Sequence, residues 1–222
     1  MANFSVLYDW VLPELPGCDL PIVNFHIRKV VRQFLKRTTL WREDVAIVLV
    51  PGQSLYPVTP IVPGVTPSDS DTDVGVPLGI LTCTVNNQVI NPITEQTRPA
   101  DGILVQPCQP NAFFQFTPDY VTFYPVPDNA ATYTALLHIY KTIPLTAADQ
   151  SMPDAIYSHY VEAIANGVKS SLMGMPKKPW SNIEMALTYN KMFADSTLAL
   201  RDRFRSGGVR NATRITFPRF GR

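Results

Sequence analysis

The chain has 222 residues, of which 45% are apolar, and a net charge of +1; this length and apolar content allow a buried core and exclude a disordered protein. The three cysteines, Cys18, Cys83 and Cys108, are widely spaced and form no CxxC pair, which argues against a disulfide framework or zinc site and favours buried thiols. No apolar run approaches the roughly 18 residues of a membrane span, and the N-terminus lacks a basic leader, so we expect a soluble protein made in the cytoplasm.

The first predicted element is an amphipathic helix that begins near residue 20 and ends by Thr38–Thr39. Asp19 stands where a capping side chain is favoured, and Pro21 is tolerated in a first turn. Basic residues occupy most of one side of this helix, and its other side carries apolar residues at three-and-four spacing, namely Ile27, Val30, Val31, Phe34 and Leu35. We assign residues 18–40 to a helical body.

Residues 41–148 change to short runs of β-branched and aromatic residues separated by Pro, Gly and Asn, which are typical of strands. Asn86-Asn87 predicts a tight hairpin, because asparagine tolerates a positive φ. The middle of the chain therefore predicts a small antiparallel β-sandwich or barrel inserted between helices. The expected strands are Val45–Val50, Ser54–Val58, Leu78–Val85, Gln88–Ile90, Gly102–Val105, Phe113–Thr117, Tyr120–Tyr124 and Tyr133–Tyr140.

Charge is segregated along the chain. Residues 1–44 carry six bases and five acids, residues 45–140 carry one base and seven acids, and residues 141–222 carry twelve bases and six acids. These segments have net charges of +1, −6 and +6, which indicates a body whose faces meet different surroundings. The alternative is that the charged residues are scattered unevenly over an ordinary protein surface.

Residues 150–206 predict two helices that form an antiparallel hairpin and complete the helical body. The first carries a stripe of small residues that would let another helix approach closely. We assign to subunit packing three residues of that region and a tryptophan near the corner of the hairpin: Gly167, Ser171, Gly174 and Trp180. The apolar face of the second helix consists of Ile183, Ala186, Leu187, Phe193, Ala194, Leu200 and Phe204. The predicted class is thus α+β, with residues 1–206 as a single domain.

Residues 207–222 form a short extended tail that begins with Gly207-Gly208 and contains arginines and aromatic residues but no acid. The arginines can pair with carboxylates or phosphates, and the alternating "TRITF" could add a strand to the sheet edge of a partner. A disordered terminus and a nucleic-acid arm are alternatives, but docking on a protein partner is favoured. The residues that we assign to docking are Arg210, Arg214, Ile215, Phe217, Arg219, Phe220 and Arg222.

The sequence contains no complete catalytic or metal-binding motif. Asp69, Asp71 and Asp73 resemble the start of a calcium loop, but that loop would need a glycine and a glutamate at positions where this chain has Val74 and Ile80. The three histidines lack metal-ligand spacing, and no phosphate-binding glycine motif is present. We therefore expect no cofactor, no metal and no enzymatic activity.

Two glutamates leave one enzymatic alternative open. Glu162 and Glu184 fall on adjacent predicted helices and could form the pair of carboxylates that glycoside cleavage requires. Glutamates on the surface of a helical hairpin are commonplace, so their presence alone gives this alternative little weight.

The order of these features resembles the head-to-tail adaptor proteins of tailed bacteriophages, the tail tubular protein A-like family. Over about residues 20–206, the similarity rests on "TLW" at Thr39–Trp41, on "GQSLYPV", and on "PDAIYSHYVEAIANG" followed by "MGMPKKPW". The resemblance implies a homo-oligomeric ring of about twelve copies beneath the portal protein at the head-tail junction of the virion. Such a ring extends the channel for double-stranded DNA, which passes without sequence-specific binding, and carries the tail nozzle or another tail factor.

The resemblance also implies that the C-terminal tail docks in clefts of the portal. The leading hypothesis is accordingly a structural, non-enzymatic adaptor that is made in the host cytoplasm and has no membrane partner. Two alternatives stay open at this point. One is a tail-associated glycan-degrading enzyme, and the other is a nucleic-acid-binding module.

Overall fold

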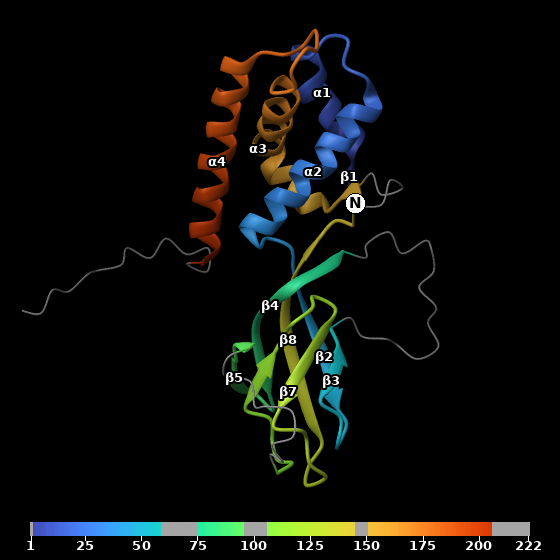
Figure 1. Ribbon diagram of the computed structural model, residues 1–222, viewed down its shortest axis with the longest axis vertical. Coiled ribbons are helices and arrows are strands. Elements are labelled where there is room, and N and C mark those ends of the chain that lie inside the picture. The colour runs from blue at the N-terminus through green and yellow to red at the C-terminus, as the bar shows by residue number, and fades with distance from the viewer. Residues whose placement is uncertain (1, 59–74, 96–105, 145–150, 206–222) are drawn as a thin grey trace, which may run out of the picture.

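The computed structural model describes residues 2–58, 75–95, 106–144 and 151–205, and places helices and strands at opposite ends of an elongated molecule (Figure 1). The helices surround one hydrophobic core and the seven-stranded sheet encloses a second. The α+β class predicted from the sequence is confirmed. Among the described helices, none is both long and apolar enough to cross a membrane.

A compact N-terminal segment, for which no element was predicted, contributes to the helical core. It consists of β1 (Ala2–Asn3), the 3-10 helix η1 (Phe4–Leu7), α1 (Tyr8–Val11) and a second 3-10 turn, η2 (Leu12–Glu14). The side-chain oxygen of Asn3 accepts a hydrogen bond from the Ser5 amide and so caps η1. The segment buries four apolar side chains, Phe4, Leu7, Val11 and Leu15.

Helix α2 (Leu20–Thr38) has the predicted bounds, and its predicted apolar face is buried. Asp19 is its N-cap, but only the backbone carbonyl of Asp19 accepts hydrogen bonds, from Ile22 and Val23. The prediction that the Asp19 side chain caps the helix is therefore wrong. The helix ends at Thr39, whose left-handed backbone (φ 50°) directs its amide to the Leu35 carbonyl.

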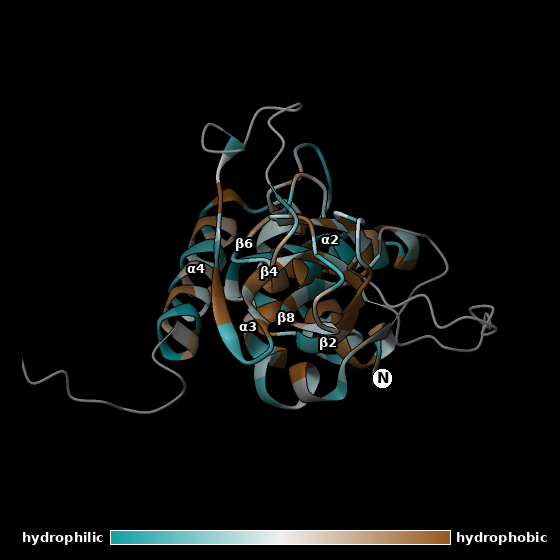
Figure 2. Cartoon of the chain, turned by 90° about the horizontal axis from the view of Figure 1, so that it is seen from below, coloured by the Kyte–Doolittle hydropathy of each residue, from teal (hydrophilic) through white to brown (hydrophobic). Residues whose placement is uncertain are grey.

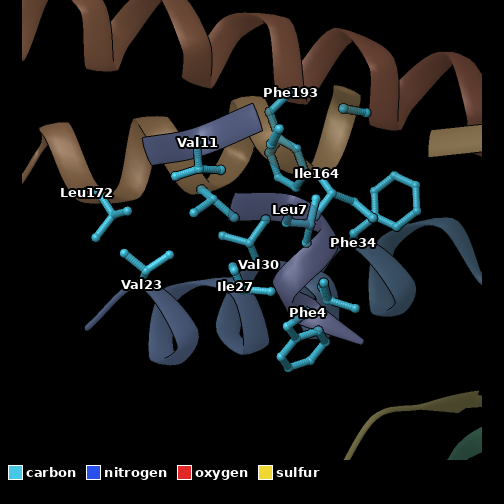
Figure 3. Packing of buried hydrophobic residues seen from close by; sticks show 14 of the residues in the cluster. Phe4, Leu7, Val11, Val23, Ile27, Val30, Phe34, Ile164, Leu172 and Phe193 are labelled. Atoms are coloured by element: carbon cyan, nitrogen blue, oxygen red, sulfur yellow. The ribbon is translucent and has the colours of Figure 1, made fainter. Parts of the chain in front are cut away.

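Helices α3 (Asp154–Met173) and α4 (Ile183–Arg205) pack against each other and, together with α2, close the helical core (Figure 3). The Ser170 hydroxyl donates to the Ala186 carbonyl across this pair. The buried row of α4 runs through Ala186, Phe193 and Thr197, so the predicted apolar face was partly wrong: Ile183 and Leu187 lie one step around the helix and are 70% and 65% exposed.

The sheet has the strand order β2-β8-β4-β5-β6-β7-β3. Its strands are β2 (Arg42–Leu49), β3 (Leu55–Pro57), β4 (Val76–Val85), β5 (Gln88–Pro92), β6 (Ala112–Phe114), β7 (Tyr120–Tyr124) and β8 (Tyr133–Thr142). A separate strand, β9 (Ser151–Met152), pairs with β1. The pairs in the large sheet are antiparallel except β5 with β6, which are parallel and differ in this from the predicted arrangement. The predicted strand Gly102–Val105 lies outside the described residues.

Two local features fix the shape of the sheet. Asn86 and Asn87 have φ of 49° and 65° in the turn between β4 and β5, which confirms the predicted hairpin. At the two ends of the strand order, the Tyr56 hydroxyl hydrogen-bonds both the amide and the carbonyl of Val50, just after β2, so the sheet nearly closes on itself. Figure 2, which looks along the long axis from the sheet end, shows hydrophobic segments on both strands and helices near the centre of the view.

The two cores meet at a narrow connection, which we call the waist, formed by Thr39–Arg42 and Lys141–Ile143. The Lys141 amide donates to the Trp41 carbonyl (2.8 Å), so the two chain crossings are hydrogen-bonded to each other. The indole of Trp41 packs on Gly75, where an added Cβ would lie 2.4 Å from the ring. Ile143 belongs to the helical core, while Ile139, four residues earlier on β8, belongs to the sheet core.

Candidate functional site

The residues predicted for docking, Arg210 to Arg222, lie outside the described part of the chain, and their role stays a prediction. The four residues predicted for subunit packing are described. Gly167 and Trp180 are buried, Ser171 is half-buried and Gly174 is exposed. Their contacts within the chain are given next, and contact with another subunit stays a prediction for all four.

At Gly167 on α3, side chains of both α2 and α4 approach the backbone closely. A Cβ added there would lie 2.6 Å from Val30 Cγ1 on α2 and 2.9 Å from Phe193 Cδ2 on α4. Figure 3 shows Val30, Phe34, Ile164 and Phe193 among the side chains that fill the space between α2, α3 and α4. Close helical approach at the small-residue stripe therefore occurs inside one chain.

The other members of the stripe also have intramolecular surroundings. Ser171 Oγ lies 2.7 Å from His26 Nδ1 on α2. Burial lowers the pKa of His26, and the nearby Lys29 charge lowers it further, so the imidazole is neutral at pH 7. Gly174 is the C-cap of α3, and Trp180 packs in the helical core at the corner before α4.

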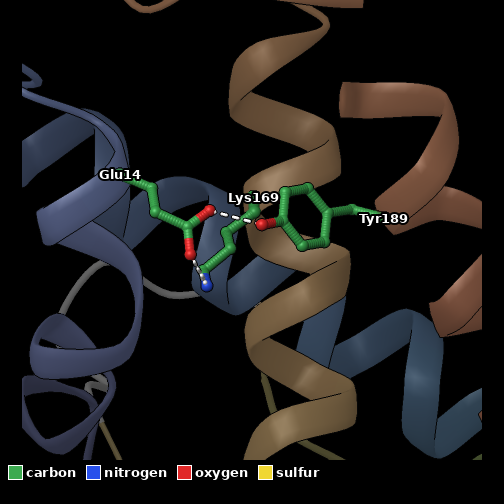
Figure 4. A network of polar contacts seen from close by, with 3 residues as sticks. All are labelled: Glu14, Lys169 and Tyr189. Carbon is green, nitrogen blue, oxygen red and sulfur yellow. Dashed lines mark hydrogen bonds and ion pairs between the residues drawn. The ribbon is translucent and has the colours of Figure 1, made fainter. Parts of the chain in front are cut away.

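A polar network ties the N-terminal segment to both helices of the hairpin (Figure 4). Lys169 Nζ on α3 donates to Glu14 Oε1 (2.6 Å), and the Tyr189 hydroxyl on α4 donates to Glu14 Oε2. Partial burial works to raise the pKa of Glu14, but the hydrogen bonds and charge of its partners outweigh this and leave it below its ordinary value. The hydrogen bond between Tyr189 and Glu14 is the main cause that raises the pKa of Tyr189 to about 12. The Glu14 carboxylate is therefore charged, and it links the N-terminal segment to α3 and to α4.

Replacing that anchor with a neutral group gives a pH-dependent prediction. Glu14→Gln should lower the free energy of unfolding by about 1 kcal/mol at pH 7, because the carboxylate is partly exposed while the Lys169 side chain is nearly buried. A folded-state pKa below the unfolded value means that the stabilisation is complete above the ordinary value of 4.5 and is lost as pH falls through the folded value. Urea unfolding of both proteins at pH 7 and near pH 3 measures the difference; an equal difference at both pH values contradicts a charged role.

The waist carries a basic cleft of about 610 Å³ between the end of α2, the start of β2 and the C-terminal half of α4. We call it the waist cleft. Four cationic side chains line it, together with Gln33, Thr39 and Leu81; the cations are Lys36, Arg37, Arg42 and Arg201. Arg42 Nε donates to the Thr39 carbonyl (3.0 Å), and its guanidinium lies over the Phe204 ring, 5.9 Å from the centroid.

Carboxylates close to this cleft are already paired. Glu43 forms an ion pair with Lys141, and Asp44 contacts His138. Among the described residues, no carboxylate lies within ion-pair distance of Lys36, Arg37, Arg42 or Arg201. The sequence showed the basic side of α2 but not that Arg42 and Arg201 would join it, because that requires the sheet and α4 to meet at the waist.

Helix α4 borders two further hollows. One of about 230 Å³, between α2 and α4, shares Arg37 and Arg201 with the waist cleft and adds the 55% exposed Leu198. The other, of about 590 Å³ between α3 and α4, is lined by residues that include His159, Glu162, Met192 and Asp195. Both hollows flank the buried row of α4, so this helix offers contact surface on either side.

The two glutamates of the enzymatic alternative start from backbone positions that are well separated along the helix pair. Ala186, two residues after Glu184, lies level with Ser170, which is eight residues beyond Glu162 and so about 12 Å along α3. Glycoside hydrolysis requires carboxyl groups roughly 5–9.5 Å apart. Within the described ranges, no group of three His, Cys, Asp or Glu side chains is placed to hold a metal ion.

The cysteines differ in their surroundings. Cys83 is buried in the sheet core, and burial raises its pKa to about 12, so it is an inert thiol. Cys18 is partly buried, and burial raises its pKa as well. Cys108 is exposed, which contradicts the prediction of a buried thiol, because it precedes β6 in a loop rather than on an inward-facing strand position.

Comparison with known protein families identifies the chain's relationship. The family model described as SU10 adaptor protein matches residues 11–214. No curated protein matches the sequence.

Proposed function

The chain belongs to the SU10 adaptor protein family, a family of phage head-to-tail adaptors, and from this premise we propose that it forms a ring of about twelve copies under the portal. The resemblance stated from the sequence is thereby confirmed at the level of the family. In this proposal the ring extends the DNA channel and carries the tail nozzle or a further tail factor. The family match over residues 11–214 is the observation that carries the proposal.

The proposed division of labour follows the order of the chain. Residues 1–206 form the adaptor domain, with a helical body from 18–40 and 150–206 and an inserted β module at 41–148, and residues 207–222 form a docking tail. Supporting this division, the described helices share one core and the described strands of the large sheet another. A body with two distinct ends suits a part that lies between two neighbours in a virion.

The docking tail would bind the portal through the seven residues Arg210, Arg214, Ile215, Phe217, Arg219, Phe220 and Arg222. Arginine suits acidic surfaces because its planar guanidinium can bind a carboxylate through two hydrogen bonds, and the apolar side chains can fill pockets. Each tail that orders on binding loses conformational entropy. A closed ring engages all of its tails together, so individually weak tails give a strong joint.

The enzymatic alternative is not favoured, because the family is a structural one. A purified chain with no activity toward cell-wall or capsular glycan would end that alternative. The nucleic-acid-binding alternative predicts DNA affinity that falls steeply with salt. If DNA instead passes freely through the channel, the chain should bind DNA only weakly at physiological salt.

Electron microscopy tests the proposal. The chain, mixed with the portal protein of the same phage, is expected to form a collar of about twelve copies on one face of the portal ring. The portal alone and the chain alone are the controls. Portals that remain bare at saturating concentrations of the chain would contradict an adaptor that binds directly beneath the portal.

A further inference from the structure

We propose that the outer face of α4 packs on the outer face of α2 in a second copy of this chain, and that this helix pair forms the contact between neighbouring subunits. The inference rests on the proposed ring and adds to it the two contact surfaces and their register. Each surface belongs to a helix whose other side lies in the helical core.

The surface on α2 is a row of cations that begins with an aromatic residue. Its members follow one another at intervals of four, three and four residues, which places them in line along one side of the helix. The Phe25 ring is 58% exposed, Lys29 and Lys36 are exposed, and Arg32 is half-buried. We call this row the α2 ridge; it consists of Phe25, Lys29, Arg32 and Lys36.

The surface on α4 combines carboxylates with leucines. We call it the α4 ridge; its members are all exposed and are spaced by three or four residues, namely Glu184, Leu187, Lys191, Asp195, Leu198 and Asp202. Leu187 and Leu198 are 65% and 55% exposed. Within the described ranges, no ion pair joins the three carboxylates to a cation. Three acids and one base give this ridge a charge of −2, against +3 from the three bases of the α2 ridge.

The two ridges do not meet within one chain. Val30 on α2 and Phe193 on α4 both approach Gly167 of α3, so these sides of the two helices face the core and the ridges face away from it. Figure 3 shows α4 on one side of α3 and α2 on the other. Each copy therefore presents one ridge to each of two neighbours, which is the head-to-tail contact of a ring.

The spacing of the two ridges fixes a register. From Lys191 onward, the α4 ridge repeats the intervals of the α2 ridge, four, three and four. With the helices parallel, the facing pairs are Phe25 with Lys191, Lys29 with Asp195, Arg32 with Leu198 and Lys36 with Asp202. This register gives two ion pairs and a cation–π contact. The antiparallel alternative pairs Arg32 with Asp195 but places Lys36 against Lys191, so repulsion disfavours it.

The parallel direction agrees with a ring. Both helices run from the far end of the helical body toward the waist, where Arg37 and Arg201 line the same cleft (Figure 1). Rotation about an axis along the length of the molecule keeps this direction, so α2 of one copy runs parallel to α4 of the next. A two-fold contact of α2 with α2, or of α4 with α4, would place like charges together.

Other occupants cover only half of this surface. An acidic protein or duplex DNA could neutralise the α2 ridge, but it would leave the carboxylates and the exposed Leu187 and Leu198 of the α4 ridge in water. A basic partner would do the reverse. A second copy of the chain covers both ridges with surfaces of opposite charge.

Cross-linking with a carbodiimide, which joins a lysine amine to a carboxylate in direct contact, tests the proposed pairs. Isotopically labelled and unlabelled full chains are mixed in equal amounts, cross-linked and digested, and the joined peptides are identified by mass spectrometry. We expect Lys29–Asp195 and Lys36–Asp202 links, with labelled and unlabelled peptides joined to each other. Links at these sites only between peptides of the same label overturn a contact between copies.

Reversal of charge tests whether the ridges drive association. Lys29→Glu with Lys36→Glu, or Asp195→Lys with Asp202→Lys, should weaken self-association by at least about tenfold, as measured by sedimentation equilibrium. An equimolar mixture of the two variants should restore it, because each α2 ridge then meets an α4 ridge of opposite charge. Association that mixing does not restore overturns the proposal.

The matched control reverses two charges outside both ridges. Lys177→Glu with Lys178→Glu lies in the turn between α3 and α4, at exposed positions, and should leave self-association within about twofold. Circular dichroism checks that each variant is folded. Equal weakening by this control overturns the proposal. If the change at Lys29 and Lys36 abolishes DNA binding and leaves self-association intact, the α2 ridge is a nucleic-acid surface instead.

The same cross-linking on chains bound to the portal separates this inference from the proposed function. A collar on the portal that lacks both links refutes the proposed contact and leaves the adaptor role intact. Links in the free chain, together with portals that stay bare, refute the adaptor role and leave the contact intact. Absence of both links from the free chain and from portal-bound chains overturns the inference.

Discussion

Deletion of residues 209–222 is expected to abolish capture of the chain by immobilised portal rings while leaving its far-ultraviolet circular dichroism unchanged. The deleted residues carry four arginines, Ile215 and two phenylalanines, and the described helices and strands end before them. Loss of many linked contacts removes the gain from multivalency, which reaches about 10²–10⁴ in apparent affinity. Capture is measured by the amount of chain that is retained on the rings.

Two partial variants separate the contributions of charge and of apolar contact. Arg210, Arg214, Arg219 and Arg222 changed to glutamine should weaken capture and flatten its salt dependence, because the remaining contacts are uncharged. Phe217→Ala with Phe220→Ala should weaken capture without changing the salt dependence. If the truncated chain is captured as well as the full chain, the tail is not the docking element.

The second large effect is expected inside the helical body. Gly167→Ala should lower the free energy of unfolding by about 1–2 kcal/mol, because overpacking of a core costs roughly 1–3 kcal/mol and alanine returns up to about 1 kcal/mol in helix propensity. The added Cβ would meet Val30 and Phe193 at under 3 Å, and both side chains are buried. Urea unfolding of the isolated chain measures the change.

Gly174→Ala is the matched control. Gly174 is exposed and has φ −75°, which alanine adopts readily, and an added Cβ would lie 3.2 Å from the carbonyl of Ser170 on the preceding turn. Its effect should stay within about 0.5 kcal/mol. The Gly167→Ala variant can be as stable as the parent chain only if α2 and α4 leave room for a Cβ. Equal stabilities would therefore show that close packing by these helices does not restrict the side chain at position 167.

Local periodicity accounts for what could be predicted of the fold. Helix α2 has a strict apolar stripe and clear end signals, so its bounds agree with the structure. The β4–β5 hairpin follows from the backbone tolerance of Asn86 and Asn87. The family was predicted from the order of several short segments and is confirmed over residues 11–214.

The errors arose where long-range contacts override local pattern. Phe4, Leu7, Val11 and Leu15 have helical three-and-four spacing, which was a usable signal, but short 3-10 and α turns are stable only against α2 and α3. On α4, Phe193 packs beside Gly167, and Leu187 lies off this buried row and is exposed. The waist cleft required three distant segments to meet, so no single segment predicted it.

The double crossing at the waist has a mechanical consequence. A single connecting strand would let the two ends of the molecule swivel about one backbone bond. Two crossings, joined by the hydrogen bond from the Lys141 amide to the Trp41 carbonyl, block that rotation and leave only bending. We therefore expect a force on the sheet end to reach the helices as a tilt rather than as a twist.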